Sequence, residues 1–161
     1  MSAVQGRLII VAGLPGSGKS THARVLAAHY GASVLSPDDW MEALGIDLWD
    51  NSKRSAIEAL QWQHAQEVLR LGGVAIIEWG TWARDERTRL REAAHALGAA
   101  VELHFLDAEP EELHRRTSMR GRENPPLTLD QLRDYWHAIE RPDADELSLF
   151  DPPTEIRHAR A

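Results

Sequence analysis

Three glycines, a lysine and a serine near the start of the chain have the types and spacing of a phosphate-binding loop. The segment reads Gly13-Leu14-Pro15-Gly16-Ser17-Gly18-Lys19-Ser20-Thr21. Glycines let successive backbone N–H groups converge on a phosphate at a helix N-terminus, where the macrodipole adds positive potential. The lysine brings a mobile charge to the β- and γ-phosphates, and the hydroxyl after it can bind Mg²⁺. The pattern predicts a nucleotide site with Lys19 and Ser20 in these roles.

Acidic side chains follow two apolar runs that have the length of strands. Asp38 comes two residues after the run 32–36, and Glu78 ends the run 74–78. In a doubly wound sheet, ligands bind beyond the carboxyl ends of the strands. We therefore expect Asp38 to accept the proton of an attacking hydroxyl, and Glu78 to hold Mg²⁺ or touch the acceptor. The alternative for both carboxylates is capping of the next helix or turn.

Two arginines precede a proline-rich loop after the predicted fourth strand. Arg116 and Arg120 lie four positions apart on a predicted helix, about 107–119, so they share one face. Guanidinium groups suit the charge of a transferring phosphoryl group and can also stack on a base. We expect both arginines to reach the nucleotide from a lid of about residues 115–128. The alternative is a solvated basic face.

Strands alternate with helices along the chain, which predicts an α/β fold with a mostly parallel sheet of about five strands. Four strands are expected at 8–12, 32–36, 74–78 and 101–106, and residues 154–158 form either an edge strand or a loose tail. Further helices are expected at 53–71, at 84–97 and after Thr128. The chain, 1–161, is expected to be a single domain with a small helical lid, and the role of residues 142–161 stays open.

Two expectations concern the faces of these helices. In the helix 53–71, one apolar stripe is expected to contain Ile57, Leu60, His64, Val68 and Leu71. In the helix 84–97, a solvated face is expected to contain Arg84, Arg87, Arg89 and Arg91 together with Asp85, Glu86 and Glu92. The alternative for Arg84 is contact with a substrate, because it lies close to the third strand.

Composition narrows the classes of function. The 161-residue chain has no cysteine, so disulfides and thiolate zinc sites are excluded. No apolar run reaches membrane-spanning length and residues 1–7 do not form a signal peptide, so we expect a cytoplasmic protein that does not bind membranes. The formal net charge of −7 counts against a protein that grips a nucleic-acid backbone.

Together, these motifs resemble the small P-loop kinases that phosphorylate hydroxyl groups. That group includes the kinase domain of phage-type polynucleotide 5′-kinase, chloramphenicol phosphotransferase and the zeta toxins, and the resemblance covers about residues 7–140. Further matches are the Asp38-Asp39-Trp40 triplet and the run from Glu112-Leu113 through Gly121. The resemblance implies an AAA-type ATP-binding protein with a P-loop NTPase-type three-layer αβα sandwich. It also implies that Asp38 is the general base and that Arg116 and Arg120 belong to the lid.

The sequence departs from this group on the acceptor side. Met41 stands where the polynucleotide kinases have an arginine that grips a phosphate of the acceptor, and an acidic-Thr-Asn segment is replaced by 78–82. An acceptor pocket that loses an arginine and gains tryptophans favours a neutral or partly apolar acceptor. The residues expected on this side are Asp38, Trp40, Met41, Glu78, Trp79 and Trp82.

The sequence thus predicts an ATP- and Mg²⁺-dependent phosphotransferase that acts on a hydroxyl of a small molecule, such as a drug, a sugar or a nucleoside-like metabolite. GTP is an alternative donor, because no base-specific motif is evident. Two rival functions are a polynucleotide 5′-hydroxyl kinase and a non-catalytic nucleotide-binding switch or resistance protein. The sequence indicates neither the identity of the acceptor nor the oligomeric state.

Overall fold

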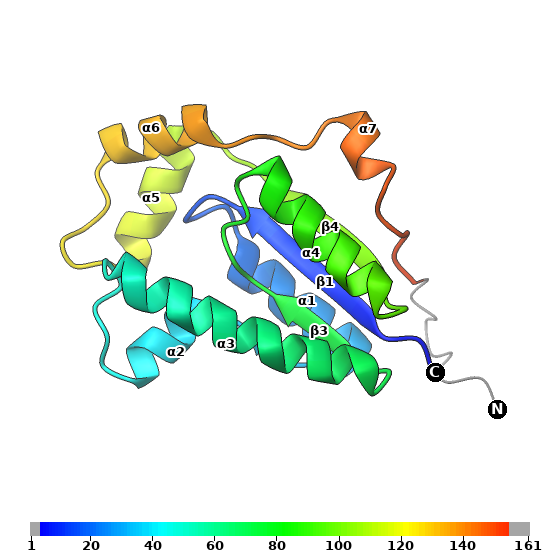
Figure 1. The fold of residues 1–161 in the computed structure, drawn as a ribbon. Coiled ribbons are helices and arrows are strands. Elements are labelled where there is room, and N and C mark those ends of the chain that lie inside the picture. The colour runs from blue at the N-terminus through cyan, green and yellow to red at the C-terminus, as the bar shows by residue number, and fades with distance from the viewer. Residues whose placement is uncertain (1–3, 155–161) are drawn as a thin grey trace, which may run out of the picture.

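A computed structural model describes residues 4–154, and its centre is a four-stranded parallel sheet (Figure 1). The strand order is β2-β3-β1-β4, and the strands are β1 (Arg7–Gly13), β2 (Val34–Leu35), β3 (Val74–Ile77) and β4 (Ala100–Leu106). Ile10 on β1 pairs with Ile77 on β3 and with Leu103 on β4. Four strands are close to the five predicted, although β2 is shorter than expected. The candidate edge strand 154–158 lies, after Thr154, outside the described residues.

Helices cover both faces of the sheet. The helices within residues 4–154 are α1 (Lys19–Tyr30), α2 (Pro37–Ala43), α3 (Asn51–Arg70), α4 (Arg84–Ala96), α5 (Pro110–Arg120), α6 (Leu129–Ala138) and α7 (Ala144–Leu147). Successive side chains of a strand point to opposite faces, so β1 serves two cores. Leu8 and Ile10 pack in a cluster with residues of α3 and α4, whereas Ile9 and Val11 pack with residues of α1. The predicted three-layer αβα sandwich is confirmed, with α1 behind the sheet in Figure 1.

A third apolar cluster joins α5 and α6 to the glycine-rich loop. Leu14 from the loop lies in this cluster with Leu113 of α5 and Leu132 of α6. Thr128 caps α6 as predicted, and a full capping box forms with Gln131. The phosphate-binding segment is therefore packed directly against the two helices that flank the predicted lid.

The buried stripe of α3 differs from the prediction. The structure buries Ile57, Gln61, Ala65 and Leu69, while Leu60 and Leu71 are exposed. The prediction followed apolarity alone. The Gln61 Oε1 atom instead accepts a hydrogen bond from the buried Trp79 indole at 2.8 Å, while its Nε2 group is buried without a partner within residues 4–154.

The prediction of a solvated arginine face on α4 is wrong for Arg87 and Arg91. Arg91 is largely buried, and its guanidinium lies 5.5 Å from the centre of the Phe150 ring. Arg87 is 0% exposed and forms an ion pair with Glu146, which is 1% exposed. The physical reason is the C-terminal segment, because α7 and the residues after it fold back over the outer side of α4 and supply Glu146 and Phe150.

Every N–H group of the Arg87 guanidinium has an acceptor. The Glu146 carboxylate accepts from Nε at 2.7 Å and from Nη2 at 2.9 Å. Nη1 donates to the carbonyls of Thr81 and Trp82, and Nη2 donates to the carbonyl of Glu140. One buried charge thereby fixes the loop after β3, the segment after α6 and the helix α7 in a single arrangement.

The segment after α7 covers the free edge of β4. The Asp151 N–H donates to the Val101 carbonyl at 2.7 Å, and the Asp151 carboxylate accepts from the Val101 N–H at 2.8 Å. These contacts occupy backbone groups of an edge strand that would otherwise face solvent. No helix within residues 4–154 has the length and apolarity to cross a lipid bilayer.

We expect Glu146→Ala to lower the free energy of unfolding by about 3–5 kcal/mol, because it leaves the Arg87 guanidinium buried without its counter-charge. Urea denaturation measures this change. The matched control is Asp145→Ala, since the neighbouring Asp145 is exposed and should cost about 0.5 kcal/mol or less. The double variant Arg87→Met/Glu146→Leu should recover only part of the loss, because it removes the unpaired charge but leaves the carbonyls of Thr81, Trp82 and Glu140 without their donor. Equal stability of the Glu146→Ala and Asp145→Ala variants would contradict the inferred role of this pair.

Candidate active site

The parallel sheet brings the predicted chemical groups to one edge. β1 and β3 are neighbours, so the glycine-rich loop that follows Gly13 lies beside Glu78, the first residue after β3. A hydrogen bond of 3.2 Å from the Gly13 N–H to the Gly80 carbonyl joins the two segments. Asp38 reaches the same edge in the first turn of α2, after β2. This is the edge at which open α/β sheets bind ligands.

Two positions of the loop require glycine, each for a different steric reason. A Cβ atom on Gly16 would lie 2.8 Å from the Leu113 carbonyl oxygen, so glycine is what lets α5 approach the loop. Gly18 is the N-cap of α1, and its φ of 99° is in the left-handed region that favours glycine. The Ser17 hydroxyl is buried and has no hydrogen-bond partner within residues 4–154. The loop thus presents a helix N-terminus at the sheet edge, while the Ser17 hydroxyl is buried on the side of Gly13.

Lys19 and Ser20 open α1 and lie against the loop and β3. The Lys19 ammonium donates to the carbonyls of Gly13 at 2.9 Å and Leu14 at 3.0 Å. Burial lowers the pKa of Lys19 to about 8, and the nearby carboxylates of Glu78 and Asp38 act in the opposite direction. Burial also raises the pKa of Glu78, whose carboxylate accepts a hydrogen bond of 2.6 Å from the Ser20 hydroxyl.

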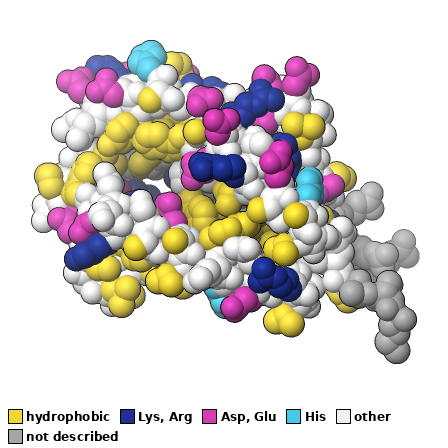
Figure 2. All heavy atoms as spheres, viewed as in Figure 1, with side chains coloured by type: hydrophobic (Ala, Val, Ile, Leu, Met, Phe, Trp, Pro, Cys, Tyr) yellow, Lys and Arg dark blue, Asp and Glu magenta, His cyan; other side chains and the backbone are white. Residues whose placement is uncertain are grey.

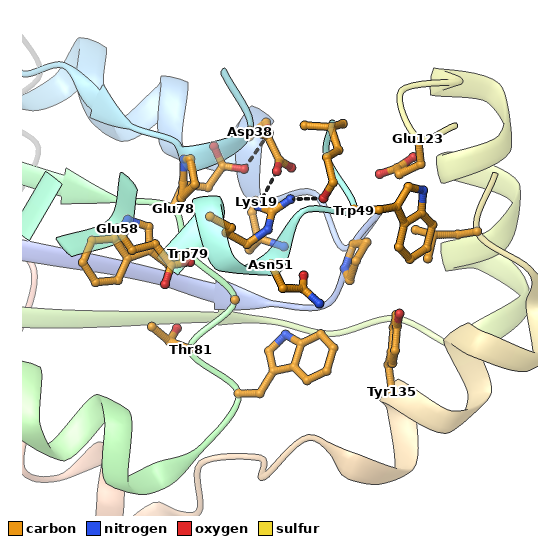
Figure 3. Close-up of a pocket in the computed structure, with 18 of the residues that line it drawn as sticks. Lys19, Asp38, Trp49, Asn51, Glu58, Glu78, Trp79, Thr81, Glu123 and Tyr135 are labelled. Atoms are coloured by element: carbon orange, nitrogen blue, oxygen red, sulfur yellow. Dashed lines mark hydrogen bonds and ion pairs between the residues drawn. The ribbon is translucent and has the colours of Figure 1, made fainter. Parts of the chain in front are cut away.

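Two cavities meet at this cluster, and Figure 2 shows the hollow face of the molecule with apolar side chains along its rim. The first, of about 810 Å³, lies over the loop and is called here the phosphate cavity. The second, of about 570 Å³, is lined by Trp49, Trp79, Trp82 and Tyr135 and is called the aromatic cavity (Figure 3). Four residues line both cavities: Lys19, Ser20, Glu78 and Arg120.

Asp38 and Asp39 face different cavities. Asp38 lines the aromatic cavity and forms an ion pair with Arg54 of α3, whose Nη2 also donates to the Leu48 carbonyl at 2.9 Å. Asp39 lines the phosphate cavity and pairs with Arg122. Arg54 was not among the predicted site residues, because it lies in a different helix, 16 positions after Asp38, and no local pattern connects the two.

The two predicted lid arginines both line the phosphate cavity. Arg116 donates to the Gly16 carbonyl at 3.2 Å and to Glu112 at 2.8 Å. Arg120 donates to Glu123 at 2.8 Å. The structure therefore places the exposed end of α5 directly over the glycine-rich loop.

The tryptophans predicted near the acceptor divide into two groups. Trp79 and Trp82 line the aromatic cavity, with the Trp82 ring 5.0 Å from Tyr135 of α6. Trp49, from the loop before α3, also lines it and donates to the Pro125 carbonyl at 3.0 Å. Trp40 and Met41 were expected here, and this expectation is corrected. Met41 is fully buried and Trp40 packs on the sheet core, because α2 lies against α3 and its apolar side chains turn inward.

The chemistry of Ser20 and Glu78 fits a magnesium ion. No group of three or more His, Asp or Glu side chains within residues 4–154 is arranged to hold a metal. Mg²⁺ bound with a nucleotide does not need such a group, because water and phosphate oxygens fill most of its coordination sites. One hydroxyl and one carboxylate that already lie 2.6 Å apart are a suitable protein contribution.

Comparison with known proteins places the chain in a family. A family model described as "AAA domain" matches residues 8–142. The match includes the glycine-rich loop, Asp38, Glu78 and the lid arginines. A search of curated proteins returned no match.

Several solved structures share the fold. A gluconokinase from Sinorhizobium meliloti is 22% identical, with a TM-score of 0.58 over 90% of this chain and 80% of that chain. Kti12 from Chaetomium thermophilum, solved with ADP-AlF3, is 20% identical, with a TM-score of 0.65 over 84% and 81%. A chain of the Pnkp1/Rnl/Hen1 RNA repair complex is 18% identical, with a TM-score of 0.68 over 98% of this chain and 51% of that chain. At these identities the likeness establishes the fold alone.

The depressed pKa of Lys19 predicts a pH-dependent stability in the absence of nucleotide. Below pH 8 both folded and unfolded chains are protonated at Lys19, and the cost of burying the charge is fully present. From about pH 8 to 10.5 the folded chain releases its proton first, so stability rises with pH. Lys19→Met lacks this titration. Between pH 7 and pH 10 we expect the free energy of unfolding of the wild type, measured by urea denaturation, to rise by about 2–3 kcal/mol relative to that of Lys19→Met.

Lys53→Met is the control for this measurement, because Lys53 is exposed on α3. A stability difference between wild type and Lys19→Met that does not change with pH would contradict the shifted pKa.

Proposed function

This chain belongs to the AAA domain family of P-loop kinases, and from that membership we propose that it transfers the γ-phosphoryl group of ATP to a hydroxyl group of a small molecule. The observation that carries the proposal is the meeting of two cavities at Lys19, Ser20, Glu78 and Arg120. One cavity has the loop that suits a triphosphate, and the other has an aromatic wall and a carboxylate, Asp38. A donor and an acceptor bound in these cavities would meet at the shared residues.

On the donor side, the amides of residues 14–18 and the start of α1 hold the phosphates. Lys19 leaves the loop carbonyls and pairs with the β- and γ-phosphates. A Mg²⁺ ion bound at Ser20 and Glu78 would neutralise phosphate charge. Arg116 and Arg120 reach the nucleotide from α5, where a planar guanidinium suits the charge spread over a transferring phosphoryl group.

On the acceptor side, Asp38 orients the hydroxyl and accepts its proton. The hydroxyl oxygen bonds to the γ-phosphorus, the bond from that phosphorus to the β,γ-bridging oxygen breaks, and ADP leaves with the electron pair. Arg54 acts through Asp38 as a positioning residue, because its ion pair and its bond to the Leu48 carbonyl fix the direction of the carboxylate. Closure of residues 115–128 over the two cavities would exclude water, which would otherwise compete as the acceptor.

Arg54 also supports a second candidate function. The sequence lacks the arginine that holds an acceptor phosphate in the polynucleotide kinases, yet Arg54 brings a guanidinium to the same cavity from α3. A polynucleotide 5′-hydroxyl kinase predicts phosphorylation of oligonucleotides with steep salt dependence. We favour the small molecule, because Arg54 is already paired with Asp38 and carboxylates outnumber cations in this cavity.

The test is transfer from radiolabelled ATP to a panel of hydroxyl-bearing metabolites and antibiotics, with a 5′-hydroxyl oligonucleotide included. Asp38→Asn should lower kcat by at least about 100-fold with little change in the KM for ATP, because it removes the proton acceptor and the counter-charge of Arg54, and neither residue lines the phosphate cavity. The exposed Asp134 of α6 supplies the matched control, Asp134→Asn. Transfer by Asp38→Asn at the wild-type rate would remove the assigned base. Tight nucleotide binding without transfer to any acceptor would favour the non-catalytic switch.

A further inference from the structure

The lining of the aromatic cavity has more carboxyl groups than cationic groups. Its lining contains five carboxylates (Asp38, Glu58, Glu78, Glu86 and Glu123) and three cations (Lys19, Arg54 and Arg120). A cavity built only to receive the tip of a triphosphate, or an anionic acceptor, would be expected to have the opposite balance. The excess of carboxyl groups therefore points to contacts with the part of the acceptor that lies away from the transferred phosphoryl group.

Three of these carboxylates have partners in the protein. Asp38 pairs with Arg54, and Glu123 accepts a hydrogen bond from Arg120. Glu78 accepts from the Ser20 hydroxyl. Glu58 and Glu86 form no ion pair and no side-chain hydrogen bond with any residue from 4 to 154. Arg54 acts on Glu58, and Arg89 and Arg87 act on Glu86, only from beyond hydrogen-bond distance, so these two side chains are the carboxyl groups of the cavity without a direct partner.

Glu58 and Glu86 come from two different helices and face the same space. Glu58 lies on α3 and Glu86 in the first turn of α4, and both line the aromatic cavity. Burial raises the pKa of Glu58 to about 7, and the nearby charge of Glu86 acts in the same direction. Two half-buried carboxylates that repel each other are stabilised in their ionised forms by a cation bound between or beside them.

Thr81 gives a second, independent indication of a ligand in this region. Its side chain is 2% exposed, and its hydroxyl has no hydrogen-bond partner within residues 4–154. Its φ of 46° is a conformation that a β-branched residue rarely adopts. Thr81 lines the same cavity, as do Trp79 and Trp82 on either side of it in the chain. Figure 3 labels Thr81 and Trp79 among the lining residues. A buried hydroxyl held in a strained backbone at a cavity wall is a group prepared for a ligand atom.

The cation that suits this wall is organic. The described part of the chain has no group of three or more metal-ligating side chains, and no phosphate is expected beside Glu58 and Glu86 to complete the coordination of a metal, as it is at Ser20 and Glu78. A protonated amine needs only hydrogen-bond acceptors and an apolar or aromatic surround, and tryptophan faces attract ammonium groups. Trp79 and Trp82 supply such a surround in the same cavity.

We propose that the acceptor is an amino alcohol or amino sugar whose protonated amine is bound by Glu58 and Glu86, with the Thr81 hydroxyl as a further polar contact. This inference rests on the proposed phosphotransfer to a hydroxyl group and names its substrate class. The reacting hydroxyl lies at Asp38, and the amine lies at the α3–α4 side of the aromatic cavity. The two carboxylates act in binding and take no part in proton transfer.

The test compares amine-bearing alcohols with their neutral N-acetyl derivatives, using glucosamine, phenylethanolamine and related pairs. Binding is measured first without ATP, by the change in tryptophan fluorescence of the full-length chain. We expect each bound amine to bind at least about tenfold more tightly than its N-acetyl derivative, as one desolvated ion pair would give. Glu58→Gln and Glu86→Gln should each reduce this preference, and the double variant should reduce it to within about twofold.

Glu67→Gln is the matched control, because Glu67 lies on the exposed face of α3. The same variants in the transfer assay should raise the KM for the amine acceptor and leave kcat almost unchanged. The proposal is overturned if the neutral derivatives bind as well as the amines, if the double variant keeps the preference, or if no amine binds. A preference for amines without any transfer would support this binding site and contradict the proposed function. Transfer to neutral alcohols alone would support the proposed function and contradict the amine site.

Discussion

The position of β1 between β3 and β4 is the constraint on which the site depends. β1 is parallel to both neighbours, so its carboxyl end, the glycine-rich loop, emerges beside the end of β3. The register that pairs Ile10 with Ile77 is what brings Ser20 within hydrogen-bond distance of Glu78. A slip of one residue would exchange the two faces of β1 and move its apolar side chains from one core to the other. Packing of the core and geometry of the site are therefore fixed by the same pairing.

Around this centre, buried polar contacts set the walls of the two cavities. Arg87 binds the carbonyls of Thr81 and Trp82, so the loop that carries the aromatic wall is attached to α4 and α7. Arg54 gives Asp38 a fixed partner across the acceptor side. Trp49 and Pro125 connect the acceptor side to the predicted lid segment. The Arg54 and Trp49 contacts join segments 16 and 76 positions apart in the sequence, and the Arg87 contacts hold the loop after β3 against the start of α4.

Local signals in the sequence were sufficient for much of this architecture. The glycine spacing, the apolar runs and the Thr128 cap depend on residues close together in the chain, and the fold class and family follow from them. Contacts between distant segments were not accessible in the same way. Arg54 and Arg87 look like ordinary arginines of amphipathic helices, and only the folded chain brings Asp38 and Glu146 to them. Met41 was expected on the acceptor side, but its burial depends on how α2 packs.

The contact between Arg87 and Glu146 also limits where the expressed chain can be truncated. The family match ends at residue 142, and the partner of the buried guanidinium lies four residues later. A fragment trimmed to the matched region would retain the whole phosphate loop and both lid arginines. It would leave a bare positive charge beneath the wall that carries Thr81 and Trp82. Expression boundaries for crystallisation or engineering therefore belong beyond Asp151, where the chain has finished covering the edge of β4.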